Sequence, residues 1–190
     1  AYTLPAMVFV PLTGVVADMY GRRTVIIPSL LAFGLGGVAI GFVEPIAAPL
    51  PTSAFQTILG LRALQGAGVA VFMSLTVALL GDFYTGATGT TAQGLRVAWN
   101  GLGGILVPLI AWALAGIAWN VPFFLYGVAF LVAGATVLFL PEPISGMEEG
   151  ASVRQTLATY GRSLRAELND LQMAVLISGG FARDFVRYAV

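Results

Sequence analysis

The sequence contains no cysteine and no histidine. Without cysteine the chain forms no disulfide, and without either residue it lacks the usual ligands of zinc and haem. Histidine is also the commonest side chain for acid–base catalysis, and the acidic residues stand outside the long apolar runs. These absences disfavour an enzyme, and we predict no metal site and no cofactor.

Charge is the second scarcity. Only 9% of the 190 residues are charged, 58% are hydrophobic, and the mean hydropathy is +0.90. A soluble domain carries about 25% charged residues, because its whole surface faces water. The formal net charge is zero, so no basic surface exists to attract nucleic acid. We therefore predict a protein embedded in a lipid bilayer, with no nucleic-acid partner.

Charge-free runs alternate with prolines, glycines and clustered charges along the chain. About 20 apolar residues at ~1.5 Å each cross a hydrocarbon core of ~30 Å. The longest charge-free run must fold back near Trp119 and Pro122, because a single helix of that length would exceed the membrane. We predict an all-α, polytopic transmembrane bundle with helices at about 2–17, 24–43, 55–81, 94–116 and 121–140.

Arginine sets the predicted orientation of these spans. The segments 18–23 and 141–170 contain five arginines, whereas the segments 44–54 and 117–120 contain none. Cytoplasmic loops carry the excess of arginine, so the first pair is predicted to be cytoplasmic. A short Gly/Thr loop at 82–93 falls on the same side.

The predicted organisation has three parts. Residues 1–140 form part of an N-terminal transmembrane bundle of five helices. Residues 141–170 form a cytoplasmic central loop with an amphipathic helix, and residues 171–190 begin a second transmembrane bundle. The chain starts and stops within apolar sequence, so we expect a piece of a larger, multi-pass protein of the cell membrane.

One segment between the first two spans has a distinctive pattern, formed by Gly14, Asp18, Gly21, Arg22 and Arg23. It resembles the signature Gly-x-Leu-Ala-Asp-x-x-Gly-Arg-Arg, which joins the second and third helices in the major facilitator superfamily. The resemblance implies a conformational lock that holds two helix bundles together in one state of a transport cycle. The alternative is an ordinary short loop with cytoplasmic arginines.

Arg62 lies inside the third predicted span, with Gln65 on the same helix face. An arginine facing lipid costs at least ~2.5–3.5 kcal/mol, so we expect it to face the bundle interior. The alternative is a side chain that extends to the membrane surface. The segment Arg62-x-x-Gln65-Gly66-x-Gly68 resembles a motif in the fourth helix of the same superfamily, where the arginine is associated with proton coupling.

A third likeness is partial. Gly104 and Pro108 match the start of the motif Gly-x-x-x-Gly-Pro-x-x-Gly-Gly of drug–proton antiporters, whose position is the fifth helix. Val107 replaces its second glycine, and Ala111 and Trp112 replace the closing pair. Pro108 lacks a backbone N–H group, so we expect a helix kink there.

The resemblance covers helices two to six, the central loop and the start of helix seven. It implies a partial major facilitator fold with inverted repeats, a small-molecule substrate, and a C-terminal bundle outside this chain. The implied function is alternating-access transport, with proton-coupled export of a small hydrophobic compound as the leading hypothesis. Arg62 is the candidate for coupling or substrate binding, with Gln65 and Asn100 as cavity candidates. Uptake of a sugar or other metabolite, and a non-transporting membrane scaffold, remain alternatives.

Overall fold

The computed structural model describes residues 13–14, 16–17, 20–51, 53–141 and 178. The chain divides into two compact units, Ala1–Gly146 and Met147–Val190, and almost all the described residues belong to the first. Most of the first predicted span, Asp18, and nearly all of the predicted central loop and second bundle lie outside the described residues.

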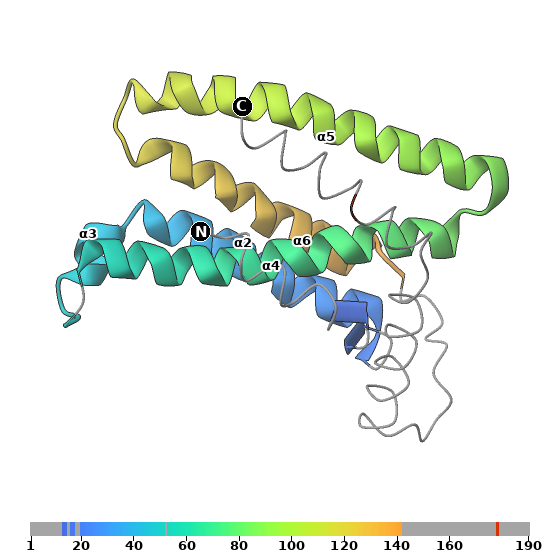
Figure 1. Cartoon of the computed structure of the whole chain (residues 1–190), viewed down its shortest axis with the longest axis horizontal. Coiled ribbons are helices and arrows are strands. Elements are labelled where there is room, and N and C mark those ends of the chain that lie inside the picture. Colours follow the sequence, from blue (N-terminus) through green and yellow to red (C-terminus); the bar gives the residue numbers. More distant parts are fainter. Residues whose placement is uncertain (1–12, 15, 18–19, 52, 142–177, 179–190) are drawn as a thin grey trace. The chain divides into compact units, whose positions relative to one another are not determined.

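The first unit is built from helices (Figure 1). They are α2 (Arg22–Ile40), α3 (Val43–Ala47), α4 (Ala54–Phe83), α5 (Gly86–Ala115), the 3-10 helix η1 (Val121–Gly127) and α6 (Val128–Phe139). Among the described residues, four segments are long and apolar enough to cross a membrane: α2, α4, α5, and η1 together with α6. The described part of the chain contains no strand, and the predicted all-α class is confirmed.

The Gly/Thr loop predicted at 82–93 is wrong. Only Tyr84 and Thr85 separate α4 from α5, and α5 begins at Gly86. Extending an existing helix costs much less than nucleating one, so residues of low helix propensity continue the long apolar span. The hydroxyl of Thr90 donates to the Gly86 carbonyl at 3.3 Å, and Gly86 makes the reversal possible with φ +60°.

Two further boundaries differ from the sequence prediction. The proline-rich segment 44–54, predicted to connect two spans, contains the short helix α3 and ends in a capping box at the start of α4. There the Ser53 hydroxyl accepts from the Gln56 backbone N–H, and the Gln56 side chain accepts from the Ser53 N–H. The last predicted span starts as the 3-10 turn η1 rather than as an α-helix. The predicted fold-back between the last two spans is confirmed.

Glycines bring α2 and α4 into backbone contact. A methyl group placed on Gly68 of α4 would lie 2.5 Å from the Ser29 carbonyl oxygen and 2.7 Å from the Phe33 nitrogen of α2. A methyl group on Gly36 of α2 would lie 2.8 Å from the Leu61 carbonyl oxygen. Lipid offers no hydrophobic drive for helix association, so such close packing is what holds the pair together.

A second glycine face of α2 receives η1 and α6. Gly37 lies against the ring of Tyr126, where no larger side chain fits. Gly34 lies against Ala129 and Phe130 of α6, and a methyl group there would be 3.0 Å from the Phe130 ring. Helix α2 is therefore the central element on which α4 and α6 are assembled.

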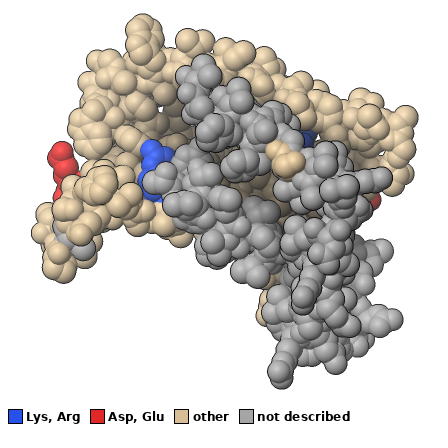
Figure 2. Space-filling model, in the orientation of Figure 1, with Lys and Arg blue, Asp and Glu red and all other residues tan. Residues whose placement is uncertain are grey.

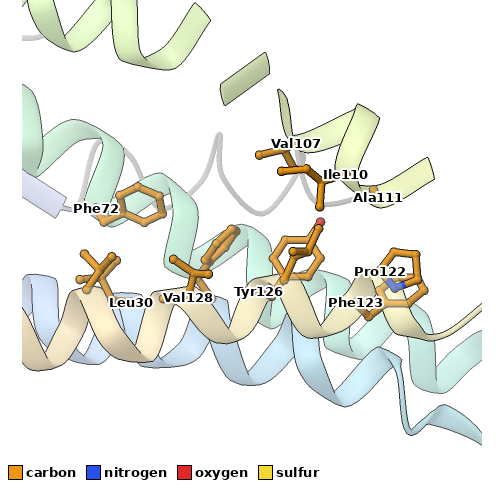
Figure 3. Close-up of a pocket in the computed structure, with 13 residues that line it drawn as sticks. Leu30, Phe72, Val107, Ile110, Ala111, Pro122, Phe123, Tyr126 and Val128 are labelled. Carbon is orange, nitrogen blue, oxygen red and sulfur yellow. The ribbon is translucent and has the colours of Figure 1, made fainter. Parts of the chain in front are cut away.

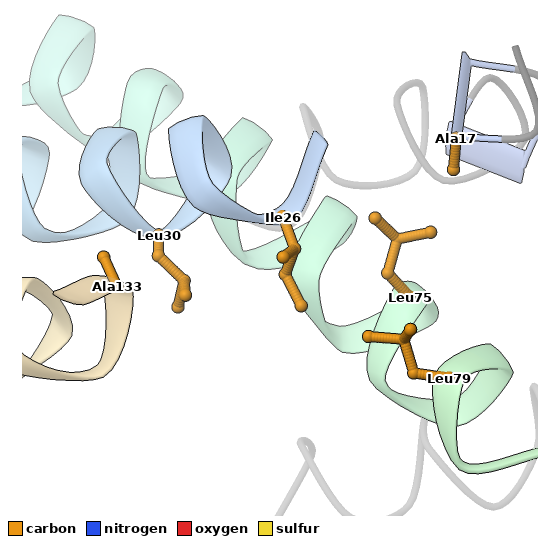
Figure 4. Packing of buried hydrophobic residues seen from close by; sticks show 6 residues of the cluster. All are labelled: Ala17, Ile26, Leu30, Leu75, Leu79 and Ala133. Carbon is orange, nitrogen blue, oxygen red and sulfur yellow. The ribbon is translucent and has the colours of Figure 1, made fainter. Parts of the chain in front are cut away.

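Aliphatic side chains fill the space between these helices at the end where α2 begins (Figure 4). The buried cluster consists of Ala17, Ile26, Leu30, Leu75, Leu79 and Ala133. It joins α2, α4 and α6, so the glycine contacts and the aliphatic cluster stabilise the same three-helix unit.

Helix α5 is the exception. None of its residues is buried within the described part of the chain, and it carries exposed apolar side chains such as Trp112. On the face drawn in Figure 2, the described residues are almost entirely uncharged, as expected for a surface in contact with lipid or with further helices.

The α2–α4 contact predicts a sharp difference between two glycines of one helix. Gly68→Ala should destabilise the protein by about 1–3 kcal/mol through overpacking against backbone atoms. Gly60→Ala is the matched control, because Gly60 has no described neighbour within 4 Å. Both changes raise helix propensity equally, so thermal unfolding in detergent isolates the steric cost. Equal melting temperatures for the Gly68→Ala and Gly60→Ala variants would contradict the close contact at Gly68.

Candidate functional site

The first candidate site lies where α2 begins. The Arg22 guanidinium, at the N-terminus of α2, forms an ion pair with Asp82 at the C-terminus of α4, with Nη1 and Oδ2 2.5 Å apart. Both side chains are partly exposed, at 25% and 32%. Such pairs contribute about 0.2–1 kcal/mol, so this contact adds little to overall stability.

Both charges occupy the unfavourable end of their helix. A helix N-terminus favours anions and a C-terminus favours cations, each by about 0.3–1 kcal/mol. Arg22 and Asp82 therefore weaken their own helices unless they pair with each other. In the sequence, Asp82 is the first residue of the segment predicted as a Gly/Thr loop, and it is not one of the predicted site residues. An acid in the last turn of a helix is the signal that points to it.

Arg23 binds a third helix. Its Nη2 donates to the Val137 carbonyl in the last turn of α6, at 2.6 Å. In a continuous helix that carbonyl would accept from the residue four positions on, but Pro141 has no N–H group. Arg23 supplies the missing donor. The two arginines thus connect the start of α2 to the ends of α4 and α6, and we call this set of contacts the arginine staple.

The other members of the predicted lock stand differently. Gly21, directly before α2, has φ +86°, a conformation that favours glycine and turns the chain into the helix. Gly14 has no described neighbour within 4 Å of an added methyl group. Asp18 lies outside the described residues.

The second candidate site is a pocket of about 230 Å³ on α4. It is lined by Phe33, Arg62, Gln65, Val69 and Tyr126. The Arg62 Nη1 donates to the Gln65 Oε1 at 2.8 Å, and the guanidinium lies 5.9 Å from the ring centroid of Phe123. These contacts place Arg62 against η1 and beside Gln65, as their shared helix face predicts.

Gln65 is 3% exposed, and its amide nitrogen finds no hydrogen-bond partner among the described residues. An unsatisfied buried donor costs about 1–3 kcal/mol. The glycine packing explains the burial of this residue, since a methyl group on Gly36 would lie 3.0 Å from the backbone nitrogen of Gln65. Arg62, which is partly exposed and lines the pocket, therefore supplies the N–H donors of the pocket.

An apolar cavity of about 580 Å³ adjoins this pocket, with Phe33 and Tyr126 lining both (Figure 3). Residues of α2, α4, α5, η1 and α6 form its wall. The hydroxyl of Tyr126 points towards α5, and the other lining side chains are apolar. Phe33 and Tyr126 pack edge to face at 5.3 Å between ring centroids.

Two predicted residues lie apart from these sites. Asn100 is exposed on α5 and lines neither the Arg62 pocket nor the apolar cavity. Pro108 is inside α5, which runs unbroken from Gly86 to Ala115, so the kink stays a prediction.

The comparison with known proteins decides the family. The model of the Major Facilitator Superfamily matches residues 1–186. The chain belongs to this superfamily. It is a multi-pass membrane protein with part of the major facilitator helical bundle.

Relatives of this chain are transporters. It is 32% identical over 124 residues to the bacillibactin exporter of Bacillus subtilis (strain 168), covering 64% of this chain and 30% of that protein. It is 25% identical over 159 residues to the multidrug transporter protein MdtP of the same organism, covering 83% and 27%. A probable 4-methylmuconolactone transporter of Cupriavidus pinatubonensis (strain JMP 134 / LMG 1197) is 26% identical over 150 residues, covering 76% and 32%.

The chain thus spans 27–32% of the length of these relatives. No solved structure matches it.

The arginine staple predicts a conformational effect rather than a loss of folding. Asp82→Asn should shift the balance between major facilitator conformations by up to about fivefold, the equivalent of ~1 kcal/mol. The chain has no cysteine, so a single Val69→Cys in the Arg62 pocket would report the change as its labelling rate.

The charge-swapped double variant Arg22→Asp/Asp82→Arg should restore the labelling rate, because it rebuilds the pair. It should also raise the melting temperature, since each charge then suits its helix end. Glu44→Gln, an exposed acid on α3, is the control. If Asp82→Asn and this control label alike, the staple does not bias the conformation.

Proposed function

We propose that this chain forms spans of a secondary transporter of the cell membrane, which works by alternating access and exports a small hydrophobic compound in exchange for protons. A C-terminal bundle would complete the substrate cavity, as in two-bundle transporters. The family supports transport. The names of two relatives, an exporter and a multidrug transporter, support export.

The apolar cavity is the observation that carries the substrate class. Its volume of about 580 Å³ falls in the ~300–1,000 Å³ range of small-molecule sites, and its lining is apolar except for the Tyr126 hydroxyl. A sugar would need many hydrogen-bond partners that this lining does not offer. The cavity therefore favours a hydrophobic compound over uptake of a sugar.

The arginine staple supports alternating access. The contacts described above are partly exposed, individually weak and located at one end of the helices. An equilibrium between conformations within a few kcal/mol of each other responds to contacts of this size, whereas folding does not depend on them. A static scaffold has no need for charges at unfavourable helix ends.

Proton coupling would involve Arg62 indirectly. A guanidinium keeps its charge in proteins, so it cannot itself release and rebind the carried proton. The described acids, Glu44 and Asp82, stand on α3 and in the last turn of α4 rather than beside Arg62. The proton carrier would therefore be an acid outside the described residues, with Arg62 tuning it or holding a negative group.

The test is transport by the complete two-bundle protein in inside-out membrane vesicles. A lipophilic fluorescent dye should accumulate when the vesicle interior is acidic and stop when an ionophore collapses the proton gradient. Arg62→Ala should abolish coupled accumulation, and Arg62→Lys should retain part of it, because lysine keeps the charge without the planar fork.

Glu44→Gln should transport normally, because Glu44 is exposed and lines none of the cavities described above. Dye accumulation that does not depend on the proton gradient would contradict proton coupling. A protein that moves no dye, sugar or metabolite in either direction would favour the scaffold.

A further inference from the structure

The described chain contains two Arg–Gln pairs with the same spacing but different surroundings. In α5, the Arg96 Nε donates to the Gln93 Oε1 at 2.9 Å, and the Gln93 amide nitrogen donates to the Val77 carbonyl of α4 at 3.1 Å. That amide group therefore has partners on both sides. Its role is to join two helices.

In the Arg62–Gln65 pair, the glutamine amide nitrogen has no carbonyl to donate to in the described part of the chain. The Gln65 oxygen accepts from Arg62, which turns the amide nitrogen away from the guanidinium. That nitrogen is buried and has no partner among the described residues. Native proteins rarely bury a donor without an acceptor, and a group from outside the described chain reaches this one only if the amide turns towards the pocket.

The pocket specifies the chemistry of that group. Arg62 offers N–H groups in a planar fork, and Gln65 holds that fork in place by accepting one of its N–H groups. The ion pair between described residues, Arg22 with Asp82, does not involve Arg62. The site thus combines a positive charge with the several N–H donors of one guanidinium, which is the arrangement that binds a carboxylate or another planar anion.

The walls of the pocket specify the rest of the ligand. Phe33, Val69 and Tyr126 surround the donors with apolar and aromatic surface, and the volume of about 230 Å³ holds a head group with a ring attached. Phe33 and Tyr126 also line the larger apolar cavity, so a ligand body can extend there.

We infer that the Arg62–Gln65 pocket binds an anionic acceptor group of the transported compound, so that the substrate class is hydrophobic or aromatic carboxylates and chemically similar anions. This inference rests on the proposed transport function and adds a polar head group to its hydrophobic substrate.

Equilibrium binding to the complete protein in detergent tests the inference without transport. The probes are naphthalene-2-carboxylate, its methyl ester, and naphthalen-2-ylmethylammonium, which share one ring system. The wild-type protein should bind the carboxylate about tenfold or more tighter than the ester, because charge-assisted hydrogen bonds are the stronger ones. Arg62→Lys should keep part of this preference, and Arg62→Gln should abolish it.

Gln65→Glu is the second variant, isosteric with the wild type. Its carboxylate would accept from Arg62 as the amide oxygen does, and would place negative charge at the pocket. Carboxylate binding should fall by at least tenfold, and ammonium binding should rise. Arg96→Gln is the matched control, since it breaks an Arg–Gln pair whose amide is already satisfied, and it should leave all three affinities unchanged.

Three results would overturn the inference. The wild-type protein binds acid and ester equally, or binds neither; or Arg62→Gln weakens both probes alike, in which case Arg62 serves an acid of the protein itself. None of these results bears on proton-driven accumulation of the lipophilic dye, so the proposed transport function is tested independently of this inference.

Discussion

The backbone contact between α2 and α4 is the constraint on which the described structure depends. Gly36 and Gly68 allow the two helices to meet without side chains between them, and Gly37 leaves the space that Tyr126 fills on the neighbouring face of α2. The same contact buries Gln65 and brings Phe33 beside it. The walls of the Arg62 pocket are thus positioned by glycines, which matter here for the volume they leave rather than for flexibility.

The charged side chains at the start of α2 and at Arg62 lie in different electrostatic environments. At the start of α2, the arginine staple holds three helix ends through contacts that are partly exposed and individually weak. At Arg62, by contrast, the charge lies half-buried beside an amide and aromatic rings. Weak, partly exposed contacts suit a step that must open and close. A half-buried charge suits recognition, because the lower dielectric around it strengthens its interactions.

Much of the fold follows from the sequence because lipid imposes a simple length rule. The described spans end within three residues of their predicted bounds, except at the start of α5, where the Gly/Thr segment proved helical. The Gly/Thr composition predicted a loop there, but the free energy gained by extending a helix outweighs the low helix propensity of these residues. The pairing of Gln65 with Arg62 also follows from the helix period. Asp82 and Val137 as partners of the arginines do not, since both depend on how distant helices cross.

The fixed charge of Arg62 limits how it could couple substrate to protons. A guanidinium stores no proton, so its influence is exerted through the groups that accept its N–H bonds. An anionic substrate and an ionised acid of the protein would compete for the N–H donors of Arg62. An acid that loses these donors becomes easier to protonate, and a substrate that loses them becomes easier to release. Gln65 fixes the direction of these donors, because its amide oxygen accepts from Arg62. Coupling and substrate selection would then be two consequences of one small set of donors.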